Sequence, residues 1–145
     1  MSDLTSGTIS IEAPISTVQG ILFDIAKYPT WSTAIKSVEV LTKDDQGRVT
    51  SAKITVDAGM MKDRVTLDYD WSAAPNRLVF SMADADLLTS MDGAYVITAD
   101  GEDTTTVSYE LTVSLSMPIP AMMRHKAEQS IVDQGLKELK TRAEA

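Results

Sequence analysis

The sequence contains no cysteine among its 145 residues. This excludes disulfide bonds, a thiolate nucleophile and the ordinary thiolate zinc sites, and it is typical of proteins in a reducing compartment. No segment approaches the roughly 20 consecutive apolar residues that a membrane-spanning helix needs. Residues 1–6 also lack the basic patch and the apolar run of a signal peptide. We therefore expect a cytoplasmic protein without stable membrane insertion.

Positive charge is scarce. The chain has 13 lysines and arginines against 21 aspartates and glutamates, which gives a formal net charge of −8. A surface that binds nucleic acid needs lysine and arginine to displace the counterions of the phosphates. We therefore expect no nucleic-acid partner.

Histidine is limited to one residue, His125. An imidazole can act as a general acid or base, but catalysis needs a second group that orients it, and the sequence places none beside it. The aspartates at 44–45 and 84–86 lack the further oxygen ligands of a calcium loop and are typical of hairpin turns. Asp63 could act as an acid at a pocket mouth, although an exposed place at a strand end is the favoured interpretation. The sequence thus predicts no metal site and no cofactor, and it leaves the catalytic residues unknown.

The hydrophobic residues of the chain are sufficient to build one hydrophobic core. Hydrophobic residues make up 43% of the chain, which is the usual level for a globular protein. The length predicts one domain over residues 1–145. Both a monomer and a homodimer remain open.

The order of secondary-structure signals is simple. Residues 8–12 alternate as in a strand, residues 15–25 carry apolar side chains on one helical face, and residues 30–33 form a short helix or turn. Residues 121–143 have the composition of a long helix. Between residues 35 and 116, turn-rich clusters separate six further strands. These clusters lie at 44–47, 57–59, 74–76, 83–86 and 100–103.

Alternation along these strands sorts their residues onto two faces. The polar face includes Arg64, Thr66 and Asp68. The apolar face is expected to carry Ile54, Val56, Val65, Leu67, Tyr69, Trp71, Leu78, Phe80, Met82, Tyr95, Ile97, Val107, Tyr109, Leu111, Val113 and Leu115.

A sheet with one apolar face must curl over a partner, and the long helix is the amphipathic element available. Its apolar stripes are expected to be Met123, Ala127, Ile131, Val132, Leu136, Leu139 and Ala143. The predicted fold is α+β. A curved antiparallel sheet of seven strands wraps around the C-terminal helix, and two short helices lie between the first two strands.

Several segments carry a resemblance to a known family. They are residues 9–14, 28–31, 35–41, 101–109 and 118–123. On these segments the chain resembles the START-like, helix-grip (SRPBCC) superfamily, within its polyketide cyclase/dehydrase and lipid-transport group. The resemblance covers nearly the whole chain and implies the helix-grip fold with a hydrophobic ligand pocket. Members of this group include aromatase/cyclases, lipid and sterol carriers and coenzyme Q-binding proteins.

The candidate ligand-binding residues are the inward aromatic residues and the methionines. Methionine adapts to ligands of irregular shape, and tyrosine offers an apolar ring with a polar tip. Each type is also common as plain core filling. The predicted pocket residues are Trp31, Val56, Met61, Leu67, Tyr69, Trp71, Phe80, Met82, Met91, Tyr95, Tyr109, Met122 and Met123.

Three functions remain compatible with these residues. The first is binding of a small hydrophobic molecule, such as a lipid, polyketide or quinone-like compound, between sheet and helix. The second is a cyclase or aromatase acting on a bound poly-β-keto intermediate. Cyclase-like members use an arginine in the pocket, whereas alternation places Arg64 on the polar face. The third is an interaction module, which would need an exposed apolar patch that the polar face does not offer.

Overall fold

The computed structural model describes residues 5–57, 62–115 and 120–145. The strands are β1 (Thr5–Ile11), β2 (Ile35–Lys43), β3 (Val49–Asp57), β4 (Lys62–Asp70), β5 (Arg77–Ala85), β6 (Leu88–Ala99) and β7 (Thr105–Leu115). The helices are α1 (Ile15–Phe23), the 3-10 helix η1 (Ile25–Thr30) and α2 (Ala121–Glu144).

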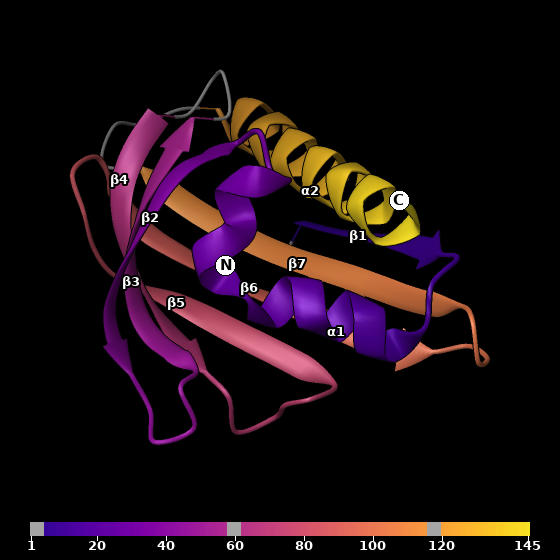
Figure 1. Cartoon of the computed structure of the whole chain (residues 1–145). Coiled ribbons are helices and arrows are strands. Elements are labelled where there is room, and N and C mark those ends of the chain that lie inside the picture. The colour runs from indigo at the N-terminus through magenta and orange to yellow at the C-terminus, as the bar shows by residue number, and fades with distance from the viewer. Residues whose placement is uncertain (1–4, 58–61, 116–119) are drawn as a thin grey trace.

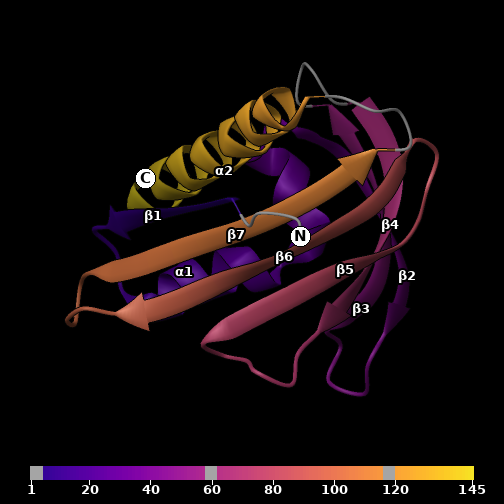
Figure 2. The same ribbon diagram turned by 180° about the vertical axis from the view of Figure 1, so that it is seen from behind.

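All seven strands form one antiparallel sheet in the order β1-β7-β6-β5-β4-β3-β2. The sheet curves, and the three helices lie on its concave side (Figure 1). Seen from behind, strands β6 and β7 pass in front of α1 (Figure 2). This arrangement confirms the predicted helix-grip fold.

The alternation of the strands explains which side is covered. In β4 the side chains of Val65, Leu67 and Tyr69 are buried, whereas Arg64 and Asp68, at alternate positions of the same strand, are exposed. Apolar residues thus face the helices and polar residues face outward, as the period of two requires. The predicted place of Arg64 on the polar face is confirmed.

The short helix lies earlier in the chain than predicted. It is η1, at 25–30 instead of 30–33. Asp24 interrupts the helical path after α1 with φ −89° and ψ 71°, and the buried Tyr28 hydroxyl then donates a hydrogen bond to the Leu22 carbonyl. This bond folds η1 back onto α1, which periodicity alone cannot reveal.

The turn predicted at 83–86 is also displaced. Strand β5 continues to Ala85, and the chain turns at Asp86 and Leu87. Asp63 causes this, because its carboxylate accepts hydrogen bonds from the backbone N–H groups of Asp86, Leu87 and Leu88 at 3.2, 3.0 and 2.8 Å. Asp63 is 7% exposed. The prediction of an exposed strand-end aspartate was therefore wrong, and its carboxylate is occupied by the turn.

Helix α2 packs on the sheet through the stripe that the sequence indicated. Ile131, Val132, Leu136 and Leu139 are buried. The prediction wrongly included Met123 in this buried stripe, since Met123 is 49% exposed. It lies in the first turn of α2, before the buried stripe begins. None of the helices in the described ranges is long and apolar enough to cross a membrane.

A buried carboxylate that sequence reasoning missed fixes the first half of α2. Glu128 is fully buried and accepts hydrogen bonds from the Thr5 hydroxyl and the Val113 backbone N–H, both at 2.7 Å. Arg124 and His125 lie beside it, at 3.9 and 3.4 Å from its oxygens. Glu128 thereby joins α2 to β1 and β7. His125 belongs to this structural cluster.

We expect Glu128→Ala to lower the free energy of unfolding by about 3 kcal/mol or more, because the substitution leaves the Thr5 hydroxyl and the Val113 N–H without their acceptor and removes the carboxylate beside Arg124. Urea denaturation at pH 7 measures this. Lys126→Ala is the control, since Lys126 is exposed on the same helix and should change stability by less than about 0.5 kcal/mol. Equal stability of the two variants would contradict this account of how α2 is held.

Candidate functional site

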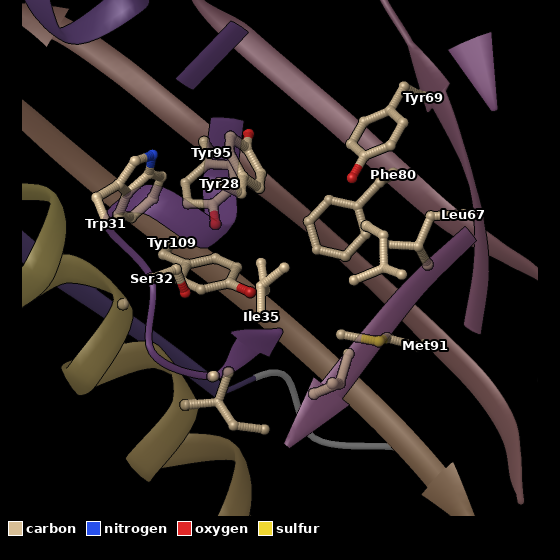
Figure 3. Close-up of a pocket in the computed structure, with 15 residues that line it drawn as sticks. Tyr28, Trp31, Ser32, Ile35, Leu67, Tyr69, Phe80, Met91, Tyr95 and Tyr109 are labelled. Atoms are coloured by element: carbon tan, nitrogen blue, oxygen red, sulfur yellow. The ribbon is translucent and has the colours of Figure 1, made fainter. Parts of the chain in front are cut away.

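A cavity of about 50 Å³ lies between α2, the concave face of the sheet and the η1–β2 connection. At roughly 10–15 Å³ per water, it has room for a few water molecules. Figure 3 shows aromatic side chains from several elements around it. Its lining consists of Tyr28, Trp31, Ser32, Ala34, Ile35, Ile54, Val56, Leu67, Tyr69, Phe80, Met91, Tyr95, Tyr109, Ile131 and Gly135.

Four aromatic residues from neighbouring strands form one wall. The rings of Tyr95 and Tyr109 stack with centroids 4.4 Å apart. Phe80 contacts both of them and Tyr69, at centroid distances between 6.1 and 6.5 Å. These residues share the inward face of β4 to β7, so the sheet holds them as a rigid surface.

Gly93 gives the Phe80 ring its position. The two residues are paired across β5 and β6. A Cβ atom on Gly93 would lie 2.4 Å from Cζ of Phe80 and 2.8 Å from the carbonyl oxygen of Glu110. The ring therefore packs directly against the bare backbone of β6, and any other residue at 93 would displace it.

The phenols of the wall are neutral over the ordinary pH range. Burial raises the pKa of Tyr28, Tyr69 and Tyr95 well above the usual value. It raises the pKa of Tyr109 to about 12, although the hydrogen bond with Tyr95 acts in the opposite direction on Tyr109. The same interaction raises the pKa of Tyr95 further.

One donor of the lining is unpaired. Nε1 of Trp31 is buried and has no hydrogen-bond partner among the described residues. The Trp31 ring packs edge-on against Tyr28 with centroids 5.2 Å apart. None of the lining residues carries a carboxylate, imidazole, ammonium or guanidinium group. The cavity lining is therefore uncharged.

Comparison with known proteins agrees with this geometry. The family described as polyketide cyclase / dehydrase and lipid transport matches residues 4–144. The chain belongs to this family.

Solved structures show the same fold at low sequence identity. A START superfamily protein from Mycobacterium smegmatis has a TM-score of 0.91 at 23% identity, with 97% of each chain covered. A protein from Thermus thermophilus has a TM-score of 0.83, also at 23% identity and 97% coverage of each chain. The Zhui aromatase/cyclase from a Streptomyces species has a TM-score of 0.78 at 14% identity, with 99% of this chain and 94% of that chain covered. A comparison with curated protein sequences gives no match.

In this member of the family, the cavity brings together most of the residues predicted from sequence. Those that line it are Trp31, Val56, Leu67, Tyr69, Phe80, Met91, Tyr95 and Tyr109. Whether they contact a ligand stays a prediction. Met61 lies outside the described residues.

The structure places four predicted residues away from the cavity. Trp71, at the end of β4, packs against Phe23 and donates from Nε1 to the Val49 carbonyl at 2.7 Å. Met82 is partly buried against the core beyond the lining. Met122 and Met123 are exposed on α2, at 81% and 49%. The expected lining of several methionines is therefore reduced, within the described residues, to Met91.

Sequence reasoning missed seven lining residues. Ile54 and Ile131 had a signal, because both were assigned to inward faces, yet the prediction favoured aromatic residues and methionines. Tyr28 and Ser32 belong to η1 and its connection, where no regular period exists. The residues missed are Tyr28, Ser32, Ala34, Ile35, Ile54, Ile131 and Gly135.

The buried phenols predict a loss of stability in alkali. In the unfolded chain tyrosine ionises near pH 10, whereas the folded phenols hold their protons to higher pH. Stability is thus complete below about pH 10 and falls as pH rises toward 12, by about 1.4 kcal/mol per pH unit for each phenol.

Urea denaturation between pH 8 and 11.5 measures this slope. Tyr69→Phe should reduce the slope of the free energy of unfolding against pH by about the contribution of one phenol. The substitution leaves the Tyr95–Tyr109 pair in place. A free energy of unfolding that stays constant to pH 11.5 would show that the phenols are not buried in solution.

Proposed function

We propose that this protein binds a small, uncharged hydrophobic molecule in the cavity between the sheet and α2. The observation that carries the proposal is the cavity lining, which is apolar and aromatic and contains no charged group. A charged ligand would lose its hydration there without gaining a partner. Membership in a family described by lipid transport and polyketide cyclisation supports the same choice.

Size limits the ligand. Pockets for drug-sized molecules measure about 300–1,000 Å³, whereas this cavity measures about 50 Å³. A molecule larger than a small ring system therefore requires side chains of the wall to move. Trp31, Ala34 and Ile35 are the partly exposed members at the η1–β2 connection. The side chains of Trp31 and Ile35 can move at lower cost than the fully enclosed strand residues.

Apolar contact alone gives weak binding. A ligand that buries about 200 Å² of apolar surface gains about 5 kcal/mol at roughly 25 cal/mol per Å². Association costs at least about 4 kcal/mol in lost freedom of motion. A useful affinity therefore needs a polar contact in addition to the apolar ones.

A cyclase reaction has less support. Among the solved structures of the same fold is an aromatase/cyclase, but general acid–base catalysis needs a positioned group whose pKa lies near the operating pH. The titratable groups of the lining are phenols whose pKa burial has raised. Arg64 pairs with Asp86 at 2.9 Å on the outer face of the sheet. We therefore assign binding as the function.

Filling the cavity tests this proposal. Gly135 of α2 borders the cavity, and a Cβ atom there would lie 3.5 Å from the Tyr109 ring, an ordinary contact. We expect Gly135→Leu to fold and to lose binding of small hydrophobic molecules. Gly20→Leu is the matched control, since Gly20 is a helical glycine with open space around its Cβ direction.

The measurement is thermal unfolding with a panel of neutral lipids, quinones and aromatic ketones. A ligand at 100 times its Kd should stabilise the wild type and Gly20→Leu by about 2.7 kcal/mol, and leave Gly135→Leu unchanged. Native mass spectrometry should show the bound molecule in the first two proteins. No stabilisation of the wild type by any compound, or equal binding by all three proteins, would refute the proposed site.

A further inference from the structure

The chain between η1 and β2 covers one side of the cavity. Trp31, Ser32 and Ala34 line the cavity, whereas Thr33 between them is exposed. Figure 3 shows Trp31 and Ser32 on the stretch of chain that runs past α2 toward Ile35. We refer to residues 31–34 as the connecting segment. A single stretch of chain thus separates the cavity from solvent on this side.

Two open grooves border the connecting segment. One, of about 380 Å³, is lined by Trp31 and by Gln134 and Glu138 of α2, among others. The other, of about 310 Å³, is lined by Thr33 and Ala34 and again by Gln134. The segment therefore has the cavity beneath it and open space beside it, into which it can move.

Within residues 5–57, 62–115 and 120–145, one hydrogen bond joins the connecting segment to α2. The backbone N–H of Thr33 donates to Oε1 of Glu138 at 3.0 Å. This bond lies at the surface, where water competes for both partners, so it can open without disturbing the sheet. The position of the segment over the cavity thus depends on a contact of low stability.

The two ends of the segment are held elsewhere. The Ser32 N–H donates to the Tyr28 carbonyl of η1 at 2.8 Å, and the Ala34 carbonyl accepts from the Asp57 N–H of β3 at 2.7 Å. Nε1 of Trp31 has no hydrogen-bond partner among the described residues. Outward motion of the Trp31 ring therefore breaks no hydrogen bond, and the ends of the segment give it fixed points about which to move.

We propose that the connecting segment is the lid of the ligand cavity and that Glu138 is its latch, so that breaking the Thr33–Glu138 hydrogen bond is a step of ligand entry and release. This inference rests on the proposed function, because it concerns access to the same cavity. Parts of a protein that move to admit a ligand are drawn from its least stable contacts.

Such a latch acts on rates and not on affinity. The Thr33–Glu138 bond closes the lid over an empty and over a filled cavity alike, so its loss raises the open population equally in both states. The rate constants of association and dissociation then rise by the same factor, and the Kd stays unchanged. A residue that contacts the ligand changes the Kd instead.

Stopped-flow fluorescence measures both rate constants. The probe is 1-aminonaphthalene, an uncharged two-ring molecule whose emission changes in apolar surroundings. We expect Glu138→Ala to raise both rate constants by about 5- to 10-fold, the range of one net hydrogen bond. Glu138→Gln keeps an acceptor oxygen without the charge and should lie between Glu138→Ala and the wild type.

Glu144→Ala is the matched control. Glu144 belongs to the same helix and also accepts a hydrogen bond from a backbone N–H, that of Glu12 at 2.8 Å. Neither Glu144 nor Glu12 lines the cavity or the two grooves. This variant should leave both rate constants at the wild-type values.

Hydrogen exchange of the Ser32 amide follows the motion without a ligand. This N–H is bonded to the Tyr28 carbonyl and exchanges when the segment opens. In Glu138→Ala its exchange should be about 5- to 10-fold faster than in the wild type and in Glu144→Ala. The amide of Leu136, in the buried stripe of α2, is the reference and should not change.

The outcomes separate the two proposals. Equal rises of both rate constants at an unchanged Kd support the latch. If the probe binds and Glu138→Ala has the rate constants of the wild type, or a changed Kd with an unchanged association rate, the latch is wrong and the binding function stands. If Glu138→Ala does not fold, Glu138→Gln decides by the same criteria. If 1-aminonaphthalene does not bind the wild type at its solubility limit, the inference fails together with the proposed site.

Discussion

The buried carboxylate of Glu128 sets the distance between α2 and the sheet, and the cavity depends on that distance. Its hydrogen bonds to Thr5 and Val113 hold the first half of the helix against β1 and β7. Leu136 and Leu139 pack the second half into the core. Between these two attachments the cavity is bordered by Gly135, which has no side chain to reach the sheet. Ile131 and Gly135 are thus the α2 residues that border the cavity.

How far the sequence could predict this differs between fold and site. Alternation along β4 predicted correctly that Val65, Leu67 and Tyr69 face inward, because a period of two depends on local backbone geometry alone. The same alternation cannot separate Tyr69, which lines the cavity, from Trp71, which packs on Phe23 at the strand end. That difference arises from the curvature of the sheet.

Hydrophobic character was a poor guide to the site for a related reason. The exposed Met122 precedes the point where α2 meets the sheet, and composition carries no information on where that contact begins. Glu128 departs from expectation in the opposite direction. A glutamate in a helix is expected on the surface, but Glu128 is buried. Its burial depends on two donors that lie 123 and 15 residues away in the sequence.

Two local penalties to stability occur together at the cavity. Glycine inside a helix is less favourable than alanine by about 1 kcal/mol, and an unpaired buried N–H group costs about 1–3 kcal/mol. Gly135 and Trp31 carry these two penalties, and both line the same cavity. Violations of local rules are expected where a protein has a function to perform. Since both residues border the same cavity, these local penalties coincide with the proposed binding site.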